Sequence, residues 1–163
     1  MPPIEVRDAR LSDDEEVDTL FSILDAYARG PAGQNAPLSQ EARENLGPGL
    51  RANTNAFVLF GLLEEVIVGA AVCVWSFSTF AGKPSVNLHD FSVLPEAQGQ
   101  GVGQALLAEL EVRARARGCA KMTLEVNASN EGAQRLYRRS GFEGWEPPTY
   151  FVSKRLVEQG RSD

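Results

Sequence analysis

A glycine-rich turn carries the strongest chemical signal in the sequence. Gly99, Gly101 and Gly103 follow an apolar run that ends near Val93, and a helical pattern begins directly after them. A strand, a glycine turn and a helix N-terminus together favour anion binding, because exposed backbone N–H groups and the helix dipole both attract negative charge. The turn lacks the Gly-Lys-Ser/Thr of a P-loop, and Gln104 stands where a dinucleotide fingerprint needs its third glycine.

Three side chains elsewhere could transfer protons. His89 is the only histidine, and imidazole is the side chain that titrates nearest to neutral pH. Glu125 lies in the next expected strand, and Tyr137 lies on the helix expected after it. Each also has a purely structural interpretation. Tyr137 could be a core residue, His89 a hydrogen-bonded sheet histidine, and Glu125 a strand-end carboxylate bonded to backbone amides.

Hydrophobic periodicity predicts the elements that would position these groups. Ser12 is expected to cap the first helix, since Glu15 follows it at the capping-box spacing. The expected strands are 4–7, 56–63, 66–77, 86–93 and 122–126, with closing strands from 142 onward and over 150–156. The expected helices begin at 12, at 39 (through about 46, interrupted by Gly47-Pro48-Gly49), at 102 (capped by Gly118) and at 130 (through 140).

This order indicates an α/β domain with a mixed, mostly antiparallel central sheet and helices on both faces. The length of 163 residues fits one domain. Strand alternation predicts that Asn87, His89, Phe91 and Val93 share one face, with Asp90 on the other.

Composition narrows the class of partner. The chain has 16 basic and 22 acidic residues, a net charge of −6, so we expect no nucleic-acid or membrane partner. Cys73 and Cys119 form no CxxC pair, so no metal site is expected, and free thiols fit a reducing cytoplasm. The N-terminus lacks a signal-peptide pattern, which also fits a cytoplasmic location.

Two separate motifs resemble those of the GNAT superfamily of acyl-CoA N-acetyltransferases. Gln98, Gly101 and Gly103 match its Gln/Arg-x-x-Gly-x-Gly/Ala signature, and the second motif is similar at Asn130, Tyr137, Gly141 and Phe142. The resemblance covers about residues 55–156. It implies a sheet that is splayed at the cofactor site. The resemblance also implies that residues 1–163 form one domain with three parts. These are the helices and loop on the acceptor side (1–54), the acetyl-CoA-binding core (55–156) and a polar tail (157–163).

The resemblance also implies roles for individual residues, with acetyl-CoA as cosubstrate. Contacts to pantetheine would come from Phe91, Ser92, Val93 and Asn130. The pyrophosphate would be held by the amides of Gln98, Gly99, Gln100, Gly101, Val102, Gly103 and Gln104. Tyr137 matches the tyrosine that protonates the departing thiolate, a nearly balanced transfer because phenols and alkyl thiols have comparable pKa values.

The base remains open between three alternatives. His89 stands where the similar spermidine/spermine N-acetyltransferases have a glutamate, which is a departure from their pattern. Glu125 matches the glutamate that serves as base in ribosomal-protein N-terminal acetyltransferases, and it precedes Tyr137 by the same interval. A relayed water, or no base at all, is the third alternative.

The sequence therefore predicts an N-acetyltransferase that moves acetyl from acetyl-CoA to a primary amine of a small molecule by direct attack. The alternatives are a protein N-terminal acetyltransferase and a non-catalytic acyl-CoA-binding sensor. A homodimer is common among proteins that this sequence resembles.

Overall fold

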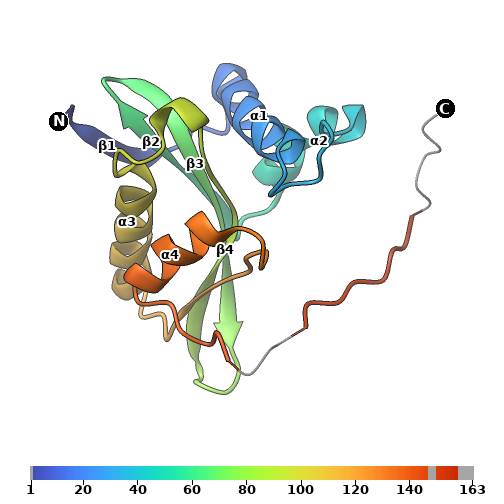
Figure 1. Ribbon diagram of the computed structural model, residues 1–163. Coiled ribbons are helices and arrows are strands. Elements are labelled where there is room, and N and C mark those ends of the chain that lie inside the picture. Colours follow the sequence, from blue (N-terminus) through green and yellow to red (C-terminus); the bar gives the residue numbers. More distant parts are fainter. Residues whose placement is uncertain (1, 147–149, 158–163) are drawn as a thin grey trace.

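The computed structural model describes residues 2–146 and 150–157 (Figure 1). Its elements are, in order, β1 (Ile4–Asp8), α1 (Asp14–Arg29), α2 (Gln40–Ala52), β2 (Ala56–Leu63), β3 (Val66–Ser78), β4 (Lys83–Val93), the 3-10 turn η1 (Pro95–Ala97), α3 (Val102–Ala116), β5 (Met122–Leu124) and α4 (Glu131–Arg139). The strands form one sheet in the order β1-β2-β3-β4-β5. Only β4 and β5 pair in parallel, so the predicted mixed, mostly antiparallel sheet is confirmed.

Two apolar clusters lie on opposite faces of this sheet. Leu20 and Ile23 of α1 pack with Phe60 and Val72 on one face, and Leu50 of α2 joins them. On the other face, α3 and α4 contribute the residues that pack on β2 to β5, namely Val102, Leu106, Leu110, Leu136 and Tyr137. The helices therefore cover both faces, as expected, with α1 and α2 on one side and α3 and α4 on the other (Figure 1).

The observed starts of the helices agree with the predicted starts to within a few residues. The cap of α1 is Asp13, not Ser12, because the Asp13 carboxylate accepts from the Glu15 amide at 3.0 Å. Ser39 caps α2 as predicted and accepts from the Ala42 amide at 3.0 Å. None of the helices in the described part of the chain is long and apolar enough to cross a bilayer.

The expected interruption of α2 at Gly47-Pro48-Gly49 is wrong, because the helix continues through Pro48 to Ala52. Proline removes one helical hydrogen bond, so contacts beyond it must hold the last turn. Arg51 supplies one of them by donating to the Leu11 carbonyl at 2.8 Å. Gly47 allows α2 to lie close to α1, because a Cβ at this position would lie 3.1 Å from Val17 Cγ1. Tertiary contacts therefore outweigh the helix-breaking tendency of the Gly-Pro-Gly sequence.

A bulge in β4 breaks the predicted alternation. Val72 pairs with Asp90 and Cys73 with Leu88, so His89 is the extra residue and faces no partner. Before the bulge Asn87 pairs with Val74, and after it Phe91 pairs with Ala71. The shared face predicted for Asn87, His89, Phe91 and Val93 is therefore wrong. Phe91 and Val93 face α3 and α4, whereas Asp90 joins Asn87 on the face of α1 and α2.

The two closing strands are absent from the described residues. Neither 142–146 nor 150–157 is a strand, and residues 147–149 lie outside the described part of the chain. The strand expected at 122–126 is also shorter, since β5 ends at Leu124. With β4 on one side, β5 is the last strand of the sheet, and no strand within residues 2–146 or 150–157 pairs with its other edge.

Candidate active site

The glycine turn presents a row of free amides at the start of α3. Gly99 and Gly101 have φ values of 76° and 91°, a left-handed conformation that favours glycine. No acceptor in residues 2–146 or 150–157 takes a hydrogen bond from the amides of Gly99 through Gln104. These donors lie at a helix N-terminus, where the helix dipole adds to their partial positive charge. The turn can therefore hold an anion without a basic side chain.

Gln98 uses its donors within the protein. Its amide donates to the Pro95 carbonyl at 3.3 Å, and its side-chain Nε2 donates to the Val93 carbonyl at 3.1 Å. The free amides therefore begin at Gly99 and not, as the sequence suggested, at Gln98. The Gln98 side chain instead ties the turn to the end of β4.

Gly103 is where the turn, β4 and α4 meet. A Cβ at Gly103 would lie 3.1 Å from Leu136 Cδ2 and 3.3 Å from Phe91 Cζ. Its small size therefore serves packing between the three elements. Gly61 of β2 does the same beneath Val102, because a Cβ at Gly61 would lie only 2.7 Å from Val102 Cγ1. These contacts set how closely the first turn of α3 approaches the sheet.

The sheet opens between β4 and β5, as the resemblance implied. Their parallel pairing covers three residue pairs and ends at Leu88 and Leu124, although β4 continues to Val93. The β4 backbone from His89 to Ser92 therefore has no strand partner on that side. This open edge leads directly to the glycine turn, and Phe91 lies beneath it.

Tyr137 of α4 lies against this opening. Its ring is 6.0 Å from that of Phe91 and 5.7 Å from that of Phe142, between centroids. Burial, with a smaller contribution from Tyr27, raises the pKa of Tyr137 to about 12. The hydroxyl has no hydrogen-bond partner among the described residues, yet no described side-chain polar atom is both sealed from solvent and unpartnered. The hydroxyl is therefore protonated, and it is not completely sealed from solvent although the residue is buried.

Asn130 is the cap of α4. Its side-chain oxygen accepts from the Ala133 amide at 3.2 Å, which leaves the side-chain Nδ2 for a ligand. A ligand contact of Asn130 can therefore use donation from Nδ2.

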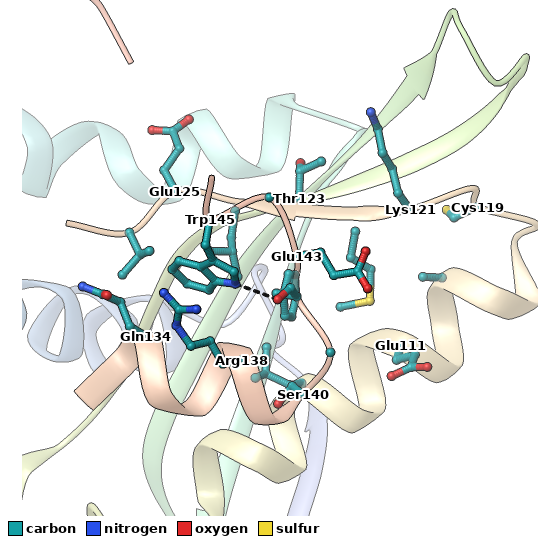
Figure 2. A pocket seen from close by; sticks show the side chains of 18 of the residues that line it. Glu111, Cys119, Lys121, Thr123, Glu125, Gln134, Arg138, Ser140, Glu143 and Trp145 are labelled. Atoms are coloured by element: carbon teal, nitrogen blue, oxygen red, sulfur yellow. Dashed lines mark hydrogen bonds between the residues drawn. The ribbon is translucent and has the colours of Figure 1, made fainter. Parts of the chain in front are cut away.

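The two candidate side-chain bases, His89 and Glu125, lie outside the Tyr137 cluster. The His89 side chain is 65% exposed, and its Nε2 lies 3.9 Å from an Asp90 carboxylate oxygen. Glu125 follows the end of β5 and is exposed. In Figure 2 its carboxylate points to the opposite side of the β5 chain from Trp145 and Arg138. Neither side chain contacts Tyr137 through a hydrogen bond in the described structure.

Sequence reasoning missed two residues. Asp90 reaches the face of α1 and α2 only because of the β4 bulge, which no sequence alternation reveals. Tyr27 lies at the end of α1, donates to the Ala32 carbonyl at 3.0 Å and affects Tyr137 electrostatically. A lone tyrosine in the last turn of a helix gives no signal of its own, since only the fold brings it near α4.

An open sheet edge, a turn with free amides and a protonated phenol lie together on this side of the sheet. The sequence matches the Acetyltransferase (GNAT) family over residues 17–142, so the chain belongs to this family. Thialysine N-ε-acetyltransferase from Bos taurus is 33% identical over 85 residues, 48% of this chain and 49% of that protein. The corresponding protein from Mus musculus is 31% identical over 87 residues. The chain thus spans about half the length of the curated relatives it matches.

Solved structures agree on the fold. The crystal structure of a probable acetyltransferase aligns with a TM-score of 0.76 and 26% identity over 93% of this chain and 98% of that chain. An aminoglycoside acetyltransferase from an uncultured soil metagenomic sample aligns with a TM-score of 0.75 and 18% identity over 93% of this chain and 96% of that chain. At the latter identity the likeness shows the fold alone.

Proposed function

We propose that this protein transfers an acetyl group from acetyl-CoA to a primary amine of a small molecule, by direct attack with both substrates bound. The observation that carries the proposal is the row of free amides from Gly99 to Gln104 beside the unpaired edge of β4. Family membership supports acetyl transfer, and the amides supply the matching chemistry for a pyrophosphate.

The residues present fit acetyl-CoA. The free amides would hold its pyrophosphate, the open edge of β4 from Phe91 to Val93 would lie along its pantetheine, and Asn130 Nδ2 could donate to it. When bound, acetyl-CoA supplies the activated acyl group as a thioester. Gln98 occupies the Val93 carbonyl, so the free backbone groups for pantetheine lie before Val93.

Tyr137 is the proposed acid. As the amine nitrogen bonds to the acyl carbon, the C–S bond breaks and the Tyr137 hydroxyl gives its proton to the sulfur. The raised pKa of about 12 keeps Tyr137 protonated at neutral pH, so the proton is available when the sulfur leaves. Because this pKa lies above that of an alkyl thiol, the transfer is uphill in the free protein and not balanced as the sequence suggested. The amine proton goes to His89, to Glu125 or to solvent. The pH dependence of turnover can distinguish these three routes.

The acceptor side favours a small cationic amine. Asp90 and Asn87 face α1 and α2 next to the opening, and a carboxylate there would attract an ammonium group. The loop between α1 and α2 is tied to α1, since the Gln34 amide donates to the Ala28 carbonyl at 2.9 Å and the Leu38 amide to Asp25 Oδ1 at 2.8 Å. A loop that is held in place in this way can form one wall of a binding site for a small acceptor amine.

Calorimetry with acetyl-CoA, followed by thiol release with a panel of amines, polyamines, amino acids and N-terminal peptides, tests the proposal. Binding with release for small amines is expected. Release only with peptides would replace the small-molecule substrate by a protein N-terminus, and binding without any release would favour a sensor.

Gly101→Glu should abolish acetyl-CoA binding through bulk and like charge. Gly118→Glu is the control for backbone strain, because Gly118 at the other end of α3 has a similar left-handed φ of 77°. No atom lies within 4 Å of a Cβ at Gly118, whereas a Cβ at Gly101 would lie 3.3 Å from Ile4 Cδ1. Equal loss of binding in both variants would show that backbone strain, and not the anion site, is responsible.

A further inference from the structure

The loop between α1 and α2 is pressed against the end of α1. We define the α1–α2 loop as residues 30–39, which connect the two helices. A Cβ at Gly33 would overlap the Tyr27 carbonyl oxygen and would lie only 2.8 Å from Ala28 Cα. These are backbone atoms of a helix, which cannot rotate aside as the end of a side chain can, so glycine is required for this close approach. A side chain at Gly33 would therefore lift the loop away from α1.

Side chains of α1 also fasten both ends of the α1–α2 loop. Near its start, the Tyr27 hydroxyl donates to the Ala32 carbonyl at 3.0 Å. At its end, Asp25 Oδ1 accepts from the Leu38 amide at 2.8 Å, while Asp25 Oδ2 accepts from Arg29 Nε at 2.8 Å. The bond from the Leu38 amide is the largest cause that lowers the pKa of Asp25 below its usual value. The carboxylate is therefore ionised at neutral pH and keeps accepting this bond.

The fastened loop lies on the side of the molecule that holds the proposed acid. Tyr27, at the root of the loop, is close enough to Tyr137 to contribute to the rise in its pKa. Figure 1 shows the loop at the end of α1 that lies toward α4, the helix of Tyr137. The β4 bulge brings Asp90 to the sheet face that α1 and α2 cover. An acceptor amine that approaches Tyr137 from this face must therefore pass the loop.

We propose that Asp25 and Gly33 determine the acceptor specificity of this protein, by holding the α1–α2 loop as a fixed wall that limits the size of the amine. The inference rests on the proposed acetyl transfer and deepens it. Both are positioning residues and not contacts of the acceptor, because each Asp25 oxygen already has a donor in the protein and Gly33 has no side chain. A wall that cannot move rejects an amine that is too long for the site, whereas a loose loop would admit it.

The test measures thiol release with three primary amines of increasing size: cadaverine, spermine and an N-terminal tetrapeptide. The wild type should prefer cadaverine. Asp25→Ala and Gly33→Ala should each reduce the preference for cadaverine over spermine, in kcat/KM, by about tenfold or more. The change should appear mainly in KM, because neither substitution alters Tyr137 or the glycine turn.

Control variants separate the loop from the charge of Asp25. Arg29→Ala removes the other partner of Asp25 and leaves the bond from Leu38, so it should keep the wild-type preference. Asp25→Asn should restore most of the preference, because an amide oxygen can still accept from the Leu38 amide. Gly30→Ala is the control for Gly33→Ala, since a Cβ at Gly30 would lie 3.4 Å from its nearest neighbour, the Tyr27 carbonyl oxygen.

Hydrogen exchange of the Leu38 amide gives a measurement that does not depend on activity. Its protection should be lost in Asp25→Ala and retained in Arg29→Ala. Asp25→Ala should not unfold α1, because alanine is a better helix former than aspartate. This variant therefore tests the proposal even if Gly33→Ala fails to fold.

The remaining outcomes overturn the proposal in different ways. Lost protection of the Leu38 amide with an unchanged preference among amines would show that the loop does not limit the acceptor, while acetyl transfer itself would stand. Retained protection in Asp25→Ala would show that this carboxylate does not hold the loop. A wild type that prefers spermine or the tetrapeptide would show that no wall limits the amine. Thiol release with no amine at all would remove the proposed function, and this inference with it.

Discussion

Tyr137 joins packing and proton donation in one side chain. Its ring fills the space between Phe91 and Phe142, while its hydroxyl keeps access to solvent. A phenylalanine would preserve nearly all of the packing and remove only the proton. Tyr137→Phe should therefore lower kcat by ~10²–10⁴-fold with acetyl-CoA affinity unchanged, the size expected for a general acid.

Steady-state thiol release and calorimetry measure both quantities for Tyr137→Phe. Ser140→Ala is the control, because it removes a hydroxyl from the end of the same helix that bonds only to the Leu136 carbonyl. Unchanged turnover in Tyr137→Phe would remove this tyrosine from the chemistry and leave it a role in the core.

Asp90 offers a second prediction at the scale of a single residue. If its carboxylate binds the ammonium group of the acceptor, Asp90→Asn should raise KM for a cationic amine about tenfold to a hundredfold, as expected for a lost charged hydrogen bond. The affinity for acetyl-CoA should not change. Asp18→Asn, an exposed carboxylate on α1, is the control. An equal KM in both variants would place the acceptor elsewhere.

At the scale of elements, the sequence predicted most of the architecture and missed its irregularities. Helical periodicity located α1 and α3, because each buries one face, and continuous apolar runs located β2 and β3, because these strands are buried on both faces. These patterns could not reveal the β4 bulge, since one inserted residue leaves the composition of the strand unchanged. The sequence also ended α2 too early, at about residue 46, because the bond from Arg51 to the Leu11 carbonyl and the close approach of Gly47 to α1 involve distant parts of the chain.

The candidate site shows the same division between local and distant information. Its motif residues could be found in the sequence because glycine spacing and a helix start are local features. The role of Gly103 in packing, the engaged amide of Gln98 and the position of Asp90 depend on neighbours that only the folded chain supplies.

The contact between Gly61 and Val102 links the sheet to the anion site. Gly61→Ala would place a Cβ 2.7 Å from Val102 Cγ1, so the first turn of α3 must move. We expect a loss of about 1–3 kcal/mol in the free energy of unfolding, together with weaker acetyl-CoA binding. Adding Val102→Ala removes the clashing methyl group and should restore part of both losses.

A double-mutant cycle of urea melts and calorimetry measures this coupling between Gly61 and Val102. Gly49→Ala is the control, because no atom lies within 4 Å of a Cβ at that helical position. It should be neutral or stabilise by up to about 1 kcal/mol. Additive effects of Gly61→Ala and Val102→Ala would show that the sheet does not set the position of α3.

At the scale of the whole molecule, one buried carboxylate connects the edge of the sheet to the helical layer. Glu16 of α1 is 6% exposed and accepts from Arg7 of β1 at 2.8 Å, from the Arg10 side chain at 2.8 Å and from the Arg10 amide at 2.6 Å. These bonds hold α1 against the first strand.

The pH dependence of stability follows from this cluster. Hydrogen bonding by Arg7 is the largest cause that lowers the pKa of Glu16 from 4.5 to about 2. A carboxylate with a lowered pKa in the folded state stabilises the fold above the unfolded value and loses that contribution as pH falls. The stabilisation is therefore complete above about pH 4.5 and is lost between pH 4.5 and 2.

Glu16→Gln should therefore lower the free energy of unfolding at neutral pH by about 2–4 kcal/mol, since it leaves two arginines without their shared anion. The difference from the wild type should shrink as the pH falls through this window, because protonation removes the same charge from Glu16. Urea melts at several pH values measure it. Glu15→Gln, at an exposed position one residue away, should show neither effect. A difference that stayed constant down to the lowest pH would mean that the shape of the side chain, and not its charge, holds α1 to the sheet.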